Sequence, residues 1–182
     1  MKLKLRIFIG ILAVLTIAFS ILHNNSYQTN DDHMDKFLQE LETKIAQREV
    51  LNAKVSQVPV AWHLDHILKS INGIYAEMEA SNPDDYQYKF NINRLVIFLT
   101  GIMPRGKGKA PDASKPPEII ETEDLYTQLA MAKQNLAKVD ALSENSHYIH
   151  YIFGTLNRQK SKRLIEIHTH HHLKIVRDIL GE

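Results

Sequence analysis

SKRLIEIHTHHHLKIVRDIL, residues 161–180, is the stretch around which the rest of the chain is organised. When positions advance by about 100° per residue, its apolar side chains fall on a single stripe, as in an amphipathic helix. The stripe consists of Leu164, Ile165, Ile175, Val176 and Ile179. The spacing therefore predicts a long helix that packs one face against a core.

Two histidines of this helix lie near the centre of the apolar stripe. They are His168 and His172, while His171 lies nearer the edge and His170 lies on the opposite, solvated side. Burial of a neutral imidazole costs free energy unless the ring nitrogens find partners. The spacing i, i+4 can bring two ring nitrogens to one divalent ion, as in metalloprotease helices. Two core histidines bonded to carbonyls or hydroxyls are the alternative.

Composition indicates one mainly helical domain with an accessory segment. The chain has 182 residues with only 7 Gly and 6 Pro, and its apolar residues mostly recur at helical spacing. Cysteine is absent, which excludes disulfides, thiolate nucleophiles and Cys-type zinc sites. The formal net charge is +1, and nothing in its distribution predicts nucleic acid as a partner.

The N-terminus has the pattern of a secretory signal or a short membrane anchor. Three basic residues precede an uncharged 16-residue run, Ile7 to Leu22. That run spans about 24 Å as a helix, slightly less than a hydrocarbon core of roughly 30 Å. Ala18-Phe19-Ser20 is a poor cleavage site because Ile21 and Leu22 follow it, so we favour an anchor. Either way, residues 1–26 place the domain across the membrane from the basic end.

Three further long helices are expected before the histidine helix. The first starts after the polar linker 27–32 and is expected to extend to about Val55; the second covers about Val60 to Ala80, and the third Glu121 to Ala141. A short apolar helix is expected within 93–102. Residues 103–117 form a basic Gly/Pro-rich surface loop without a P-loop pattern, and a role in covering a site or binding an anion is its alternative. Residues 143–157 are expected to be a connection.

The second helix offers two candidate histidines. Periodicity places His63 nearer the apolar stripe and His66 on its flank, so periodicity alone favours His63 as the inward residue. The acidic neighbours Asp65 and Glu166 both point away from the core on the wheel. We therefore expect both carboxylates to be solvated, and neither to be a general base.

Several motifs together resemble a known group of proteins. They are Trp62 with His66-Ile67-Leu68-Lys69-Ser70-Ile71, Met103-Pro104-Arg105-Gly106, His150-Tyr151-Ile152-Phe153-Gly154-Thr155-Leu156, and His168-x-x-His171-His172-Leu173. In this order they are similar to an uncharacterised bacterial domain family of the DinB/YfiT-like superfamily of metal-dependent four-helix bundles. The likeness covers about residues 34–180, and the closing histidine motif is its most specific part.

The resemblance implies an all-α fold and a metal site. It implies a DinB-like four-helix bundle over residues 33–182, with the basic Gly/Pro loop between helices and an N-terminal hydrophobic helix in front. One histidine of the second helix and two of the last, spaced H-x-x-x-H, bind a divalent ion such as zinc or nickel in that superfamily. Carried over, the ligands are His66, His168 and His172, which overrides the preference for His63. His170 stands where an acidic residue is common in the family, and His150-Tyr151 replaces a common His-Pro.

Two classes of function remain open at this point. Members of the superfamily use the metal to turn a small thiol into a nucleophile, so the resemblance implies a metal-dependent, thiol-activating transferase acting on a small molecule. A non-catalytic envelope protein that binds metal or ligand, or a purely structural bundle that has lost its metal, is the alternative. We expect the cell envelope as location, with the domain anchored by its N-terminal segment or secreted after cleavage. A homodimer is left open.

Overall fold

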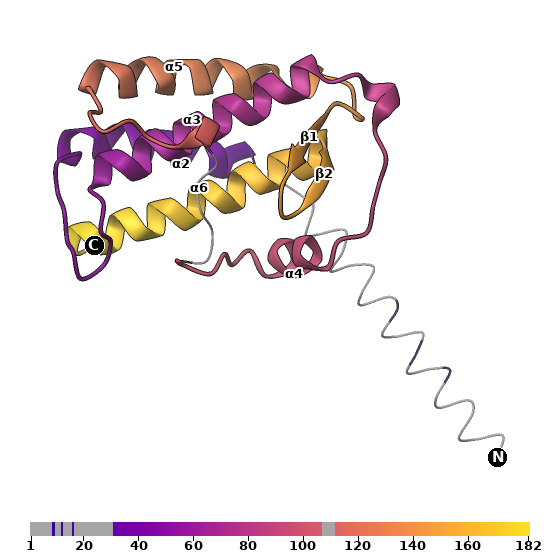
Figure 1. Cartoon of the computed structure of the whole chain (residues 1–182), viewed down its shortest axis with the longest axis horizontal. Coiled ribbons are helices and arrows are strands. Elements are labelled where there is room, and N and C mark those ends of the chain that lie inside the picture. Colours follow the sequence, from indigo (N-terminus) through magenta and orange to yellow (C-terminus); the bar gives the residue numbers. More distant parts are fainter. Residues whose placement is uncertain (1–8, 10–11, 13–15, 17–30, 107–111) are drawn as a thin grey trace.

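The computed structural model describes residues 31–106 and 112–182, together with Ile9, Leu12 and Thr16. These residues are mostly helical, with one small sheet (Figure 1). The elements are α2 (Asp31–Lys44), α3 (Val60–Ala80), α4 (Ile92–Thr100), α5 (Thr122–Lys138), α6 (Arg158–Leu180), β1 (His147–His150) and β2 (Gly154–Asn157). The boundaries predicted for α3 are confirmed, and α5 and α6 start and end close to those predicted.

Helix α3 lies at the centre of the core. It packs against α5 on one side and α6 on another, and α2 packs against both α6 and α5. Its first two turns are buried nearly all round, since polar side chains there are buried as well as the apolar Leu64, Ile67 and Leu68. A helix that is buried on most sides can bring polar side chains into the interior from more than one face. This arrangement allows α3 to supply a buried site.

The first helix is shorter than predicted. It ends at Lys44 and is followed by a 3₁₀ turn, Ile45–Gln47, instead of continuing to Val55. The chain then turns so that the carbonyls of Val50 and Arg48 accept hydrogen bonds from the amides of Val60 and Ala61, at 3.0 and 2.8 Å. Those two amides belong to the first turn of α3, which has no side-chain cap. This added coil therefore provides hydrogen-bond acceptors for two amides at the start of the next helix.

The predicted connection at 143–157 contains a β-hairpin instead. Strands β1 and β2 pair antiparallel, with His147 opposite Asn157 and His150 opposite Gly154. Gly154 has φ of 71°, a conformation that glycine adopts without strain. The His150 ring stabilises the turn, because its Nδ1 accepts hydrogen bonds from the amides of Ile152 and Phe153 at 3.1 and 3.2 Å. Four-residue strands are too short to give a clear alternation in sequence.

Buried Arg94 connects α4 to this hairpin. Its guanidinium donates to the carbonyls of Phe153 (3.0 Å), Thr155 (3.4 Å) and Lys89 (2.5 Å). Asn91 caps α4 through its side-chain oxygen and donates to the Ile152 carbonyl at 2.8 Å. The position of the hairpin, and of His150 within it, therefore depends on α4.

Apart from Ile9, Leu12 and Thr16, the proposed N-terminal signal or anchor at 1–26 lies outside the described residues, as does most of the linker at 27–32. Only the last two linker positions are described, and they form the first residues of α2. Among the residues that are described, no helix is both long and apolar enough to span a bilayer.

Candidate metal centre

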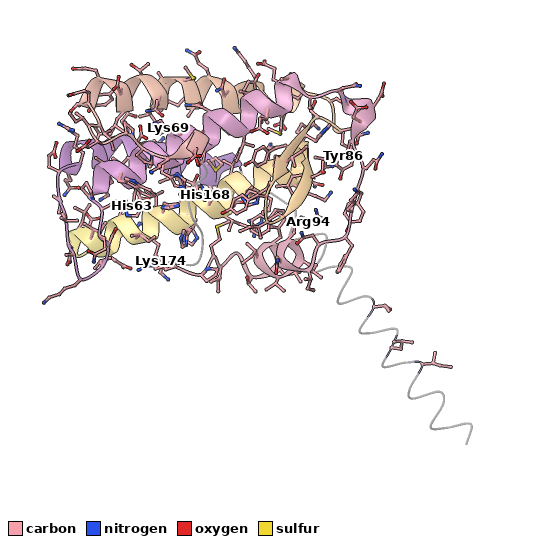
Figure 2. The ribbon with its side chains drawn as sticks, viewed as in Figure 1. His63, Lys69, Tyr86, Arg94, His168 and Lys174 are labelled. Carbon is pink, nitrogen blue, oxygen red and sulfur yellow. The ribbon has the colours of Figure 1, made fainter. Side chains whose placement is uncertain are left out.

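Helices α3 and α6 bring four histidines together in the interior. His63 and His66 come from α3, and His168 and His172 come from α6; Figure 2 labels His63 and His168 in the layer between these helices. The rings of His168 and His172 lie with centroids 4.6 Å apart, as the i, i+4 spacing predicts. The His66 ring lies 4.9 Å from that of His168 and 4.8 Å from that of His172. Three rings thus surround one point.

The three predicted ligands form a group that could hold a metal ion. One ring nitrogen from each of His66, His168 and His172 lies within 4.8 Å of the corresponding nitrogens of the other two. The closest pair, His66 Nε2 and His168 Nε2, is separated by 3.2 Å. Two nitrogens bound tetrahedrally to zinc at about 2.0–2.1 Å would be roughly 3.3 Å apart. This pair therefore already has the spacing of two ligands of one ion.

The second nitrogen of His66 fixes the orientation of its ring. His66 Nδ1 lies 2.8 Å from the Ser114 carbonyl oxygen, which can only accept a hydrogen bond. The ring proton is therefore on Nδ1, and the Nε2 lone pair points toward the other histidines. A metal-bound histidine usually donates its other N–H to a carbonyl or carboxylate in this way. Trp62 stacks on the same ring at a centroid distance of 5.1 Å and holds its plane.

His172 is oriented by a chain of hydrogen bonds through His63. We assign the Ser56 hydroxyl as donor to the Val58 carbonyl at 3.1 Å, and its oxygen then accepts from His63 Nε2 at 3.0 Å. His63 Nδ1 is then left as an acceptor, and it lies 3.0 Å from His172 Nδ1. His172 Nδ1 consequently carries the proton, which leaves Nε2 of His172 with a free lone pair. His63 therefore does not belong to the ligand group; it orients one member of it.

Burial keeps the imidazoles of this site neutral. Loss of solvation lowers the pKa of His66 and lowers the pKa values of His168 and His172 well below the usual range, and neighbouring histidines add to the effect on His168 and His172. It also lowers the pKa of His63 to about 4. Only the neutral ring can bind a metal. At neutral pH the three ligands would therefore not need to lose a proton first.

Both acidic neighbours are buried, contrary to the prediction that they would be solvated. Asp65 is only 1% exposed; it accepts from Gln128 Nε2 at 2.7 Å and pairs with Lys69 Nζ at 2.8 Å. Glu166 pairs with Arg163 at 2.7 Å. The helical wheel assumed one buried face for each helix, whereas α3 and α6 each have neighbours on several sides. Neither carboxylate belongs to the histidine group.

The remaining histidines differ in their surroundings. His170 is exposed, as predicted, and stacks on Phe37 at 5.8 Å. His171 is half-buried, and a hydrogen bond with the Met103 backbone connects it to the loop after α4. Burial lowers the pKa of His150 to about 4, and the charge of a protonated His150 would further lower the pKa of His168. Sequence periodicity placed His63 on the inner side, as observed, but gave no indication of its contact with His172, which is 109 residues away.

Comparison of the chain with protein-family models, curated proteins and solved structures finds no match. The chemistry of the site must therefore be argued from its own residues.

Proposed function

We propose that this protein is a DinB-like four-helix bundle that binds a divalent ion, zinc or nickel, through His66, His168 and His172. Helices α2, α3, α5 and α6 would form the bundle. The observation that carries the proposal is that three neutral imidazoles converge within 4.8 Å of one another. For His66 and His172, hydrogen bonds also commit the other ring nitrogen as a donor. Without an ion, His168 Nε2 would donate to His66 Nε2 at 3.2 Å, and a bound ion would replace that hydrogen bond.

The resemblance in sequence supports the same ligand set. The resemblance implies one ligand from the second helix of the domain and two ligands from the last. In the described part of the chain, α3 is the second long helix and α6 the last, and they contact each other directly. This agreement concerns position and spacing, and the family relationship itself remains part of the proposal.

The resemblance implies a thiol-activating reaction, and the set of ligands is compatible with it. Three neutral ligands cancel none of the charge of a divalent ion and leave at least one coordination position open. An ion held by these residues would supply a Lewis acid that lowers the pKa of a small thiol, the chemistry needed for that thiol to displace a leaving group from an electrophile. The surrounding residues have two tasks. Ser114 orients His66 and His63 orients His172, and burial keeps both rings neutral.

A second candidate is a non-catalytic envelope protein that binds metal or a small ligand. The state of the carboxylates favours it: Asp65 and Glu166 are held in ion pairs with Lys69 and Arg163. Among the described residues the histidine group contains no carboxylate, so it offers no evident general base.

Turnover separates the two candidates. The full chain, reconstituted with zinc or nickel, is incubated with a small thiol and a chromogenic alkyl or aryl electrophile. The enzyme proposal predicts a rate above that of free metal and thiol, lost in His66→Ala and kept in His170→Ala, whose ring is exposed. Stoichiometric metal without turnover for a panel of thiols and electrophiles would reject the enzyme and leave the binding protein.

A further inference from the structure

Helix α4 presents an apolar stripe to the outside of the molecule. Its inner side is filled by Phe98 and Arg94, both almost fully buried. The outer stripe follows helical spacing i, i+4, i+7 and continues into the residues on either side of the helix. It consists of Tyr88 (54% exposed), Phe90 (69%), Ile92 (58%), Val96 (50%), Leu99 (36%) and Ile102 (69%). Six large exposed apolar side chains within 15 residues form a patch, unlike the scattered single residues found on ordinary surfaces.

The neighbouring hairpin turn adds another aromatic residue near this stripe. Asn91 donates to the Ile152 carbonyl at 2.8 Å, which places the turn beside the N-terminal end of α4. Tyr151, the preceding residue in that turn, is 62% exposed. Tyrosines together with aliphatic residues and phenylalanine are typical of surfaces that sit at a membrane–water interface.

The charge of this segment disfavours a basic protein partner and favours anionic lipid. Residues 86–106 contain no acidic residue; Arg94 is buried against carbonyls and Arg105 pairs with Asp178, so Lys89 supplies the positive charge of the stripe. Exposed Lys89 lies within the stripe region, between Tyr88 and Phe90. A surface that combines apolar side chains with positive charge fits anionic lipid headgroups and disfavours a basic protein partner.

The start of α2 lies on the same side of the molecule as α4. His33 in the first turn of α2 contacts Glu166 at 3.4 Å, Glu166 pairs with Arg163 at 2.7 Å, and Arg163 donates to the Phe98 carbonyl of α4 at 3.5 Å. The apolar run that ends at Leu22 is nine residues from Asp31, a span of at most about 30 Å. If that run is embedded in a membrane, α4 must stay close to the bilayer.

We infer that the outer stripe of α4, with Tyr88 and Phe90, docks on the surface of a lipid bilayer that contains anionic lipids. Its apolar side chains enter the headgroup–acyl boundary, and Lys89 contacts the headgroups. This inference rests on the N-terminal run as an anchor and is independent of the metal site. Helix α5, on the far side of α3 from α4, would face away from the membrane (Figure 1).

The absence of cysteine from the chain allows a clean test. Single-cysteine variants Val96→Cys on α4 and Met131→Cys on α5 are labelled with an environment-sensitive fluorophore in the full chain. Both native side chains are about half exposed, so neither change disturbs the core. Each variant is reconstituted in vesicles of neutral and anionic phospholipid, and the quenching by lipids with a spin label on the upper acyl chain is measured.

The docking model predicts unequal quenching. The label at position 96 should lose about half of its emission or more, as expected at a depth of about 5–10 Å in the interface, while the label at 131 changes little. Adding Ile92→Asp to the Val96→Cys variant should reduce quenching to the control value. Low quenching at both positions would overturn the inference, whether the protein fails to float with vesicles or a second copy of the chain covers α4. Equal quenching at both positions would overturn it as well.

Discussion

Replacing His63 by Leu tests how the site orients its ligands. His63 Nδ1 lies 3.0 Å from His172 Nδ1, and in the assigned hydrogen-bond chain it is the acceptor for the His172 proton. Leucine fills a similar volume but accepts no hydrogen bond, so the buried N–H of His172 loses its partner and the ring loses the constraint that points Nε2 at the metal. Loss of such an outer partner typically weakens metal affinity by about 10–100-fold, or about 1.4–2.7 kcal/mol.

The assay is competition for zinc with a chromogenic chelator, using the full chain without a His tag. His63→Leu should bind zinc about 10–100-fold more weakly than wild type, and His63→Gln should recover part of the loss because its amide can both accept and donate. His170→Ala is the matched control and should bind as wild type, since its ring is exposed on the same helix. If His63→Leu abolishes binding as His66→Ala does, His63 is itself a ligand. If its affinity is unchanged, the hydrogen-bond chain from Ser56 to His172 does not orient the site.

Three other predictions concern stability. Zinc at 100 times its dissociation constant should stabilise the fold by about 2.7 kcal/mol, which calorimetry should record as a rise in Tm of roughly 5–10 °C; His168→Ala should remove that rise. Arg94→Met should destabilise the protein by about 3 kcal/mol or more in urea titrations, because three carbonyl oxygens lose their donor. The control Arg105→Met breaks only a half-exposed ion pair with Asp178 and should cost less than about 1 kcal/mol. Burial lowers the pKa of His150 to about 4, from a usual 6.5. The neutral His150 ring therefore contributes its full stabilisation above pH 6.5 and loses it as the pH falls toward 4. The urea midpoint of the metal-free protein should drop over that range, and it should drop less steeply in His150→Gln.

Helical periodicity was sufficient to predict the elements that carry the site. Helix α3 was predicted with its observed ends, and the stripe of α6 correctly placed His168 and His172 on the inner side and His170 outside. Long helices with strong periodicity are determined largely by their own sequence. The two strands, in contrast, are too short for a clear alternation, and their turn accepts hydrogen bonds from Asn91 and Arg94, which are 61 and 59 residues from their partners.

The choice between His63 and His66 could not be made from periodicity. Both rings are buried, because α3 is covered by α5, α6 and the 3₁₀ turn that contains Ser114. Their roles differ only through partners 48 and 109 residues away, the Ser114 carbonyl and the His172 ring. The same limitation explains the error over Asp65, whose burial depends on Gln128 of α5. A wheel assigns one face to the core and cannot represent a helix with several neighbours.

Metal content tests the central claim most directly. The full chain is expressed without a His tag, reconstituted separately with zinc, nickel and iron, and freed of loosely bound ion before analysis by mass spectrometry. The account predicts close to one zinc or nickel ion per chain for wild type and a loss of that ion in His66→Ala, His168→Ala and His172→Ala. No bound metal in the wild-type protein under any of these conditions would contradict it, and would leave the converging histidines as part of a structural core.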